Sequence, residues 1–408
     1  MTRAGGGGGR VPLVLALVLS LGTSLSQAQL LDFGAAERAG MAAHGPWPPP
    51  PAPDRSNAVQ RAPAAVALGQ RLFNDPRLSV DGQLSCASCH VPSLAFQDAR
   101  PLPVGRAVQT VGLRNTPGLL DSAWQRWLGW GGAHDSLWAA SLAPLLASHE
   151  MGHGSVASVA AAVRRTAAWR SAWQRAFGTL SADDERVAVQ VAKALAAYQA
   201  TLVSASTPFD DFRDALLRDD AAAARRYPLA AQRGLRLFMG SARCTVCHAG
   251  PAFSNGEFAD IGRPFFVPGG VDAGRHAGLQ TLLASRWNRL GAFNDAGAAD
   301  PRAVTTRHVV QEHRHFGEFR VPTLRQLQCT APFMHDGSLP SLHAVVQHYN
   351  QLDEERLHAD GERILRRLDL SDAEAADLEA FLATLSTRCD AAPPQRRAPG
   401  VAGPRPGR

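Results

Sequence analysis

The middle of the chain carries hydrophobic positions at the spacing of amphipathic helices. Within residues 155–177 and 181–204, Val, Ala, Leu and Trp recur every three or four positions, which predicts two helices with one buried face each. Ser181 is the predicted N-cap of the second helix, and Asp183 and Asp184 follow in its first turn, where negative charge is favoured. This part of the chain is therefore expected to form a helical core.

A further helix is predicted near the C-terminal end. Ser371 and Glu374 have the spacing of a capping box, and the hydrophobic period that follows continues to about Ser386. Alternating patterns typical of strands are nearly absent from the chain. The sequence therefore predicts an all-α protein with long irregular loops.

One short pattern occurs twice: Gly and Leu-Phe at the end of a helical segment, then Cys-x-x-Cys-His, then Phe. The first copy comprises Gly69–Phe73, Cys86–His90 and Phe96. The second copy comprises Gly234–Phe238, Cys244–His248 and Phe253. The repeat predicts two copies of one small helical module, with a boundary near residues 226–229.

Each Cys-x-x-Cys-His segment has the spacing for covalent attachment of a haem. Its two cysteines can form thioethers to both vinyl groups of one haem, and the adjacent histidine then lies under the iron. The predicted attachment residues are Cys86, Cys89 and His90 for one haem, and Cys244, Cys247 and His248 for the other.

Three other interpretations of the paired cysteines compete with haem attachment. A zinc ribbon would place the two pairs about 15–20 residues apart, and here the gap is far longer. A thioredoxin-type pair would need a βαβ setting, and a local disulfide within each pair would leave both histidines unexplained. Two c-type haems are therefore the predicted cofactors.

Composition and the N-terminus indicate an exported globular protein. The chain has 408 residues, 45% of them hydrophobic, which excludes global disorder and a fibrous protein. The net charge of +6 is scattered, so nucleic acid is not an expected partner. The hydrophobic stretch Val11–Leu21 is too short to span a bilayer and is typical of a secretory signal peptide, with an uncleaved anchor as the alternative. We expect a periplasmic location and no transmembrane helix.

The predicted organisation has five segments. They are a signal peptide (1–28), a Pro-rich N-terminal arm (29–61), an N-terminal haem domain (62–225), a C-terminal haem domain (226–390) and a disordered tail (391–408).

Two haems alone do not distinguish an electron carrier from an enzyme, because an enzyme needs one iron with an open position. No His or Met lies between Val91 and Ala133, the stretch expected to cover the first haem. Glu150 is the acidic candidate beyond it, since a carboxylate beside an open haem can transfer a proton between the two oxygens of bound peroxide. Its alternative is an ordinary surface carboxylate.

Five further segments accompany the haem motifs. They are Arg114–Pro117, Trp130–Gly132, Glu150–Gly152, Phe319–Arg325 and Ala331–Gly337. In order and spacing the set resembles the bacterial di-haem cytochrome c peroxidase family, which includes the methylamine-utilisation enzyme MauG. The resemblance covers roughly residues 62–386 and implies two cytochrome c-like domains with active sites near their interface.

The resemblance assigns roles to individual residues. It implies that the N-terminal haem is the peroxidatic centre, that Glu150 is its distal acid and that Trp130 is a relay between the haems. It also implies a Ca²⁺ held by Asn115 and by the backbone carbonyls of Thr330 and Pro332, which are suitably hard oxygen ligands. Without the resemblance, Trp130 would be a core aromatic and Asn115 a turn residue.

The chain departs from classical peroxidases of this family at the sixth ligand of the second haem. Fourteen residues after His335, where those members place Met, stands Tyr349, as in MauG. A phenolate ligand stabilises oxidised iron and lowers its potential relative to Met. Met334 and His348 are rival ligands, and a buried core tyrosine is the alternative for Tyr349.

Two departures concern the first haem. Ala107 stands where classical members carry a loop histidine on the iron, which predicts a site open without reductive activation. Ala140 stands where the family usually has Gln, and His149 and His153 are expected to be solvated loop histidines rather than substitutes for it. Cys329 and Cys389 remain outside the haem motifs, and the sequence leaves open whether they pair.

These inferences predict an exported di-haem peroxidase that reduces hydrogen peroxide to water with electrons from a small c-type cytochrome or a similar donor. The first alternative is a MauG-like enzyme that uses peroxide-derived high-valent iron to oxidise a protein or small-molecule substrate. The second is a di-haem electron carrier without catalysis.

Overall fold

The computed structural model describes residues 5, 29–50, 53–108, 112–267, 270–361, 363–387 and 389. The predicted signal peptide lies almost entirely outside these residues, and the predicted disordered tail lies entirely outside them.

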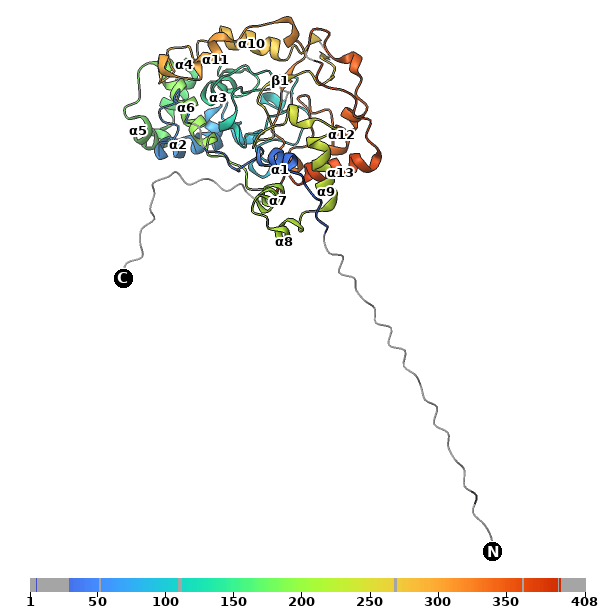
Figure 1. Ribbon diagram of the computed structural model, residues 1–408. Coiled ribbons are helices and arrows are strands. Elements are labelled where there is room, and N and C mark those ends of the chain that lie inside the picture. Colours follow the sequence, from blue (N-terminus) through green and yellow to red (C-terminus); the bar gives the residue numbers. More distant parts are fainter. Residues whose placement is uncertain are drawn as a thin grey trace.

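The described chain is mainly helical, as predicted (Figure 1). Its α-helices are α1 (Ala35–Ala42), α2 (Pro63–Asn74), α3 (Leu137–Leu146), α4 (Val156–Arg165), α5 (Arg170–Phe177), α6 (Asp184–Gln199), α7 (Pro208–Leu217), α8 (Ala221–Ala224), α9 (Leu229–Met239), α10 (Arg275–Ala284), α11 (Ala303–His308), α12 (Leu342–Asn350) and α13 (Asp372–Ala383). Its strands have two residues each and are β1 (Phe258–Ala259), β2 (Phe266–Val267), β3 (Gly270–Val271) and β4 (Phe319–Arg320). β1 pairs antiparallel with β4, and β2 with β3.

Hydrophobic spacing and capping residues predicted where helices occur more accurately than where each helix begins and ends. The capping box of Ser371 and Glu374 opens α13 as predicted. The single helix predicted over 155–177 is wrong: the chain breaks at Thr166 into α4, a 3₁₀ turn and α5. The predicted cap of α6 is also wrong, because Asp183 accepts from the first-turn amides while Ser181 accepts from the amide of Asp183. The carboxylate of Asp183, two residues closer to the helix, therefore replaces the hydroxyl of Ser181 as the cap.

Two clusters of buried hydrophobic side chains divide the molecule. The first contains side chains of α2 to α6, and the second contains side chains of α1, α7, α9, α12 and α13. In Figure 1 these sets of helices lie on opposite sides of the molecule. α7 precedes the predicted boundary at 226–229 but packs with the second cluster through Phe209 and Phe212. The limits of the two predicted domains stay a prediction.

The glycines of the repeated pattern bring two pairs of helices into close contact. Gly69 on α2 faces the backbone carbonyl of Ala194 on α6, and Gly234 on α9 faces the carbonyl of Asp377 on α13. A Cβ at either glycine would overlap the carbonyl oxygen opposite, so only glycine allows the two backbones to approach this closely. The two copies of the repeat therefore share a close glycine-mediated helix contact as well as a sequence motif.

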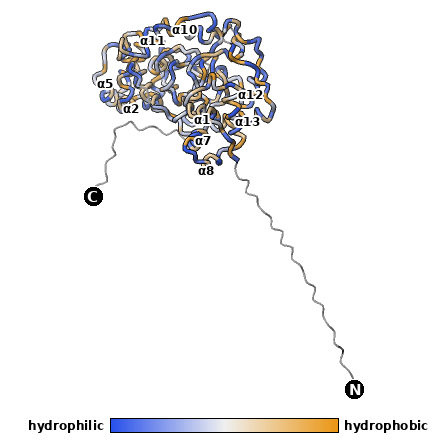
Figure 2. The backbone as a smooth tube through the Cα atoms, viewed as in Figure 1, coloured by the Kyte–Doolittle hydropathy of each residue, from blue (hydrophilic) through white to orange (hydrophobic). Residues whose placement is uncertain are grey.

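The segment that contains α10 and α11 belongs to the second half of the chain but packs against the first half. Lys193 on α6 forms an ion pair with Asp295 at 2.5 Å, and Trp287 donates to Glu185 at 2.7 Å. The two helices lie along the top of the view in Figure 1, and hydrophilic stretches follow the outer loops there in Figure 2. Within the described residues, no helix has the length and hydrophobicity needed to cross a membrane.

Candidate active site

The first Cys-x-x-Cys-His segment forms a 3₁₀ turn, Cys86–Ser88, that leads into His90. The His90 amide donates to the Cys86 carbonyl at 2.9 Å, and the ring Nδ1 lies 2.9 Å from the carbonyl oxygen of Phe96. A carbonyl oxygen can only accept, so Nδ1 carries the proton and Nε2 presents its lone pair. This tautomer and this orientation suit a histidine that ligates a metal through Nε2.

The second segment repeats the arrangement with its own phenylalanine. Cys244–Val246 forms the turn, and the His248 amide donates to the Cys244 carbonyl at 2.8 Å. The Nδ1 of His248 lies 2.9 Å from the carbonyl oxygen of Phe253. The phenylalanine noticed in the sequence repeat thus contributes its backbone oxygen, a role that the sequence pattern did not reveal.

The donor atoms fit covalently attached haem better than the competing interpretations. No disulfide joins Cys86 to Cys89 or Cys244 to Cys247, so the interpretation of a local disulfide within each pair does not hold. Cys86 packs against the first hydrophobic cluster and Cys244 against the second, so the two pairs do not meet at one zinc ion. Burial raises the pKa of Cys86 and of Cys244 to about 12, which fits thiols in an apolar porphyrin environment. Each segment could therefore hold one haem through two thioethers and one imidazole.

Glu150 lies close to the first Cys-x-x-Cys-His segment. Burial raises the pKa of its carboxyl group, and the positive charge of His149 offsets part of that rise. Burial is the main cause that raises the pKa of Cys86 and Cys89, and the negative charge of Glu150 adds to it, so the carboxylate lies within electrostatic range of these thiols. The fold thus brings an acid near the first Cys-x-x-Cys-His segment from a position 60 residues beyond His90, and the role of Glu150 as distal acid stays a prediction.

Arg106 fixes the segment that carries Glu150, and sequence reasoning missed it. Its Nε donates to Asp81 at 2.8 Å, its NH1 donates to the Ser148 carbonyl at 3.0 Å, and its backbone amide donates to the His149 carbonyl at 3.0 Å. The guanidinium also occupies the space where a side chain on Gly152 would lie. The next residue, Ala107, has a left-handed backbone with φ of +56°. The loop around Ala107, where classical members of the family carry a histidine, is therefore tied to the loop that carries Glu150.

The expectation for the two histidines beside Glu150 was right for one and wrong for the other. His149 is exposed, as expected. His153 is only 7% exposed, with Nε2 2.7 Å from the Leu78 carbonyl and Nδ1 2.8 Å from the Ser158 hydroxyl. Because both ring nitrogens are occupied, His153 is a structural link between loops and not a solvated side chain.

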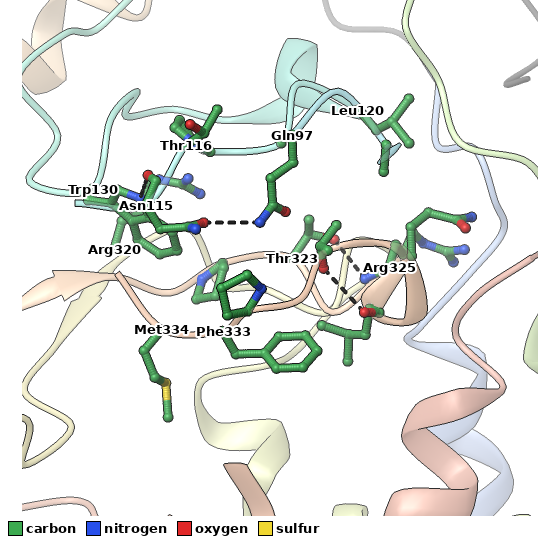
Figure 3. A pocket seen from close by; sticks show the side chains of 18 of the residues that line it. Gln97, Asn115, Thr116, Leu120, Trp130, Arg320, Thr323, Arg325, Phe333 and Met334 are labelled. Atoms are coloured by element: carbon green, nitrogen blue, oxygen red, sulfur yellow. Dashed lines mark hydrogen bonds between the residues drawn. The ribbon is translucent and has the colours of Figure 1, made fainter. Parts of the chain in front are cut away.

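A small cavity of about 100 Å³ lies between the two halves of the chain (Figure 3). The predicted relay and calcium ligands line it together: Asn115, Trp130, Thr330 and Pro332. The indole of Trp130 donates to the Asn115 carbonyl at 2.8 Å, and the Asn115 amide donates to the His335 carbonyl at 2.7 Å. Hydrogen bonds thus connect both halves at this point.

The oxygen atoms around this cavity are compatible with a hard cation. The side-chain oxygen of Asn115 accepts from the Gln97 amide at 3.2 Å, and its NH2 donates to the Arg100 carbonyl at 2.6 Å (Figure 3). Gln97 was not among the predicted ligands, although it lines the same cavity. Amide and carbonyl oxygens of this kind are what Ca²⁺ prefers, and the calcium site itself stays a prediction.

The three candidate sixth ligands of the second haem lie in different surroundings. Tyr349 is half-buried on α12, where burial and then the charges of Cys244 and Cys247 raise the pKa of its phenol, so it lies near the second attachment site. Nε2 of His348 is held by the Ile261 carbonyl at 2.8 Å. The side chain of Met334 lines the small cavity, and its thioether extends away from Asn115 (Figure 3).

Cys329 and Cys389 form a disulfide, which settles the pairing that the sequence left open. The bond ties the chain after α13 to the 3₁₀ turn Leu327–Cys329. Thr330, the next residue, lines the small cavity, so the covalent link lies directly beside it.

Comparison with known proteins agrees with this geometry. Residues 63–217 match the family model described as di-haem cytochrome c peroxidase. The chain is 35% identical over 323 residues to the methylamine utilization protein MauG of Methylorubrum extorquens, covering 79% of this chain and 78% of that protein. The chain belongs to the di-haem cytochrome c peroxidase and MauG family. It is therefore an oxidoreductase of the di-haem peroxidase type, and membership implies two c-type haems.

Other members of the family carry different names. The cytochrome-c peroxidase IdrP1 of Denitromonas iodatirespirans is 34% identical over 349 residues, covering 84% of this chain and 86% of that protein. A solved MauG-like protein associated with microbial copper homeostasis is 26% identical, with a TM-score of 0.65 over 87% of this chain and 99% of that chain. Because relatives are named both as peroxidases and as MauG, membership leaves the exact activity open.

Proposed function

We propose that this protein is an exported di-haem peroxidase that reduces hydrogen peroxide to water with electrons from a small c-type cytochrome or a similar periplasmic donor. The observation that carries the proposal is the half-buried carboxyl group of Glu150 beside Cys86 and Cys89, on the segment that Arg106 fixes. An electron carrier closed by two strong axial ligands has no use for an acid at this place.

Cys86, Cys89 and His90 would hold the peroxidatic haem, and Cys244, Cys247 and His248 would hold the second haem. The first haem supplies an iron that binds peroxide and accepts its oxidising equivalents. Phe96 keeps the proton on Nδ1 of His90, so that Nε2 can face a metal.

Glu150 would act as the acid–base group of the reaction. Its raised pKa brings the carboxyl group closer to neutral pH, where a group can both accept and return a proton. Arg106 would act as a positioning residue, since it ties the backbone on either side of Glu150 to the loop of Ala107 and to Asp81. Holding the carboxylate in place reduces the entropy that must be lost in the transition state.

Trp130 would pass electrons between the two halves. Its indole donates to the Asn115 carbonyl, and the guanidinium of Arg320 lies 5.9 Å from its ring. A calcium ion held by Asn115, Thr330 and Pro332 would stabilise the same junction, because these residues come from both halves of the chain.

The test is peroxide-dependent oxidation of a reduced small c-type cytochrome by the purified holoprotein. We expect rapid oxidation that depends on both peroxide and Glu150. Spectra that show two fully low-spin haems and no reaction with peroxide would refute the enzyme and favour the electron carrier.

A second function is supported by Tyr349. If its phenolate ligates the second haem, the chain resembles MauG at this ligand, and the enzyme would use the oxidising equivalents on a protein or small-molecule substrate. The nearness of Tyr349 to Cys244 and Cys247 and the Ala at position 107 favour this alternative. Poor turnover of cytochrome c, together with a long-lived oxidised state after peroxide, would decide for it.

A further inference from the structure

A second cavity, of about 340 Å³, lies where the segment 123–127 meets α11. It shares no lining residue with the small cavity beside Asn115, and no residue of either Cys-x-x-Cys-His segment lines it. Its volume lies within the range of small-molecule sites, and a planar aromatic molecule such as benzene fits a cavity less than half as large. The space is therefore sufficient for a substituted aromatic ring.

One cation on the wall of this cavity has no ion-pair partner among the described residues. Arg302 on its wall is half-buried, donates to the Gln125 carbonyl at 3.0 Å and forms no ion pair with any residue that the structure describes. Arg289, which also lines the cavity, is already balanced by Asp54 at 2.8 Å and Asp300 at 2.6 Å. Burial and then the charge of Arg289 lower the pKa of Arg302, and the charges of Asp54 and Asp300 offset part of that shift.

A second cation lies at the rim. Arg126 lines the cavity and forms an ion pair with Glu257 at 2.9 Å, in which both side chains are about half exposed. An exposed pair of this kind contributes little, so Arg126 can turn toward a bound anion at small cost.

A buried, unsatisfied acceptor belongs to another residue that lines the same cavity. Asp135 lines it and is only 3% exposed. Its Oδ2 accepts from the Arg289 amide at 2.9 Å and from the Thr306 hydroxyl at 2.7 Å, whereas its Oδ1 has no hydrogen-bond partner among the described residues. A buried carboxylate oxygen without a donor is costly and calls for a ligand group that supplies one.

Two tryptophans, Trp124 and Trp127, line the cavity. Trp127 is buried and fixed from one side by the Arg275 guanidinium, 4.4 Å from its ring. Trp124 packs against Trp47, with ring centroids 5.7 Å apart. Rigid indoles favour a planar ring over an inorganic anion.

We propose that this cavity binds a small aromatic carboxylate that carries a hydrogen-bond donor. The carboxylate pairs with Arg302, the ring lies against Trp124 and Trp127, and the donor group supplies the missing hydrogen bond of Asp135. The site does not use the predicted haem ligands or Glu150, so it goes beyond the proposed peroxidase activity.

The test is isothermal titration calorimetry of the full-length holoprotein with 4-hydroxybenzoate, in the absence of peroxide. We expect one saturable site per chain. Arg302→Met, which keeps a long side chain without the charge, should weaken binding at least about tenfold, because it removes the charge-assisted hydrogen bond to the carboxylate. Arg307→Gln, at an exposed position of α11 (the helix that begins directly after Arg302) that does not line the cavity, should bind like the wild type.

A ligand series on the wild-type protein tests the same idea without a folding risk. The neutral 4-hydroxybenzyl alcohol should bind at least about tenfold more weakly than 4-hydroxybenzoate, and inorganic phosphate should not displace the carboxylate. Absence of saturable binding, equal affinity of the two arginine variants, or equal affinity for the neutral alcohol would each overturn the proposal. Because no arm uses peroxide, failure here leaves the proposed peroxidase activity untouched.

Discussion

Replacing Glu150 by Gln tests the proposed chemistry most directly. Glutamine keeps the size of the side chain and its hydrogen-bonding capacity, but it cannot accept and return a proton at neutral pH. General acid–base groups contribute roughly 10²–10⁴-fold, so the reaction of the holoprotein with peroxide should slow at least about 100-fold. This is about 2.7 kcal/mol of added barrier.

The burial of Glu150 predicts the opposite effect on stability. Burial raises the pKa of its carboxyl group, so the folded protein holds that proton more tightly than the unfolded chain. The ionised carboxylate therefore destabilises the fold at neutral pH, and the cost disappears as the pH falls through the raised pKa. Glu150→Gln removes that cost, so the variant should unfold at the same temperature as the wild type or a higher one.

The rate and the stability are measured on the same preparations. Stopped-flow absorbance at the haem Soret band follows the reaction with excess peroxide, and circular dichroism follows thermal unfolding. His149→Gln is the matched control on the adjacent exposed residue and should react within about threefold of the wild type. The wild-type rate should also fall as the pH decreases through the raised pKa, because only the ionised carboxylate accepts a proton.

Two outcomes would refute this reasoning. A Glu150→Gln variant with normal haem content and a rate within about threefold of the wild type would remove Glu150 from the chemistry. A variant that loses rate and thermal stability together would assign it a structural role.

Three further predictions concern the second half of the chain. Tyr349→Phe should change the spin state and the potential of the second haem in absorption spectra and redox titrations, and unchanged spectra would make Tyr349 a packing residue. Gly234→Ala should destabilise the protein by roughly 3 kcal/mol or more in urea unfolding, because its Cβ would overlap the carbonyl oxygen of Asp377. The control Gly40→Ala lies inside α1 with room for a methyl group, so it should leave stability unchanged or raise it by up to about 1 kcal/mol. Equal effects of the two substitutions would contradict the packing argument. Cys389→Ser opens a disulfide that spans 60 residues and should cost about 4 kcal/mol by loop entropy, and an unchanged unfolding midpoint would show that the bond does not constrain the unfolded chain.

Signals carried by neighbouring residues predicted much of the fold and of the haem sites. The capping box of Ser371 and Glu374 and the hydrophobic periods that became α4, α6 and α13 depend on residues within a few positions of one another. The repeated Cys-x-x-Cys-His segments were visible for the same reason. The break at Thr166 and the cap at Asp183 were missed because hydrophobic spacing does not report which of several nearby polar groups the backbone will use.

By itself, the sequence determined that the chain is helical and that it carries two Cys-x-x-Cys-His segments built on one repeated pattern. It also determined which residues are candidates for haem attachment, the acid, the relay and the sixth ligand. Only the tertiary structure decided that Arg106 holds the segment of Glu150, that Cys329 pairs with Cys389, and that Arg302 and Asp135 line one cavity. The physical reason is that these contacts join residues far apart along the chain, and their energies depend on distance, burial and unpaired charge. None of these quantities exists until the chain has folded.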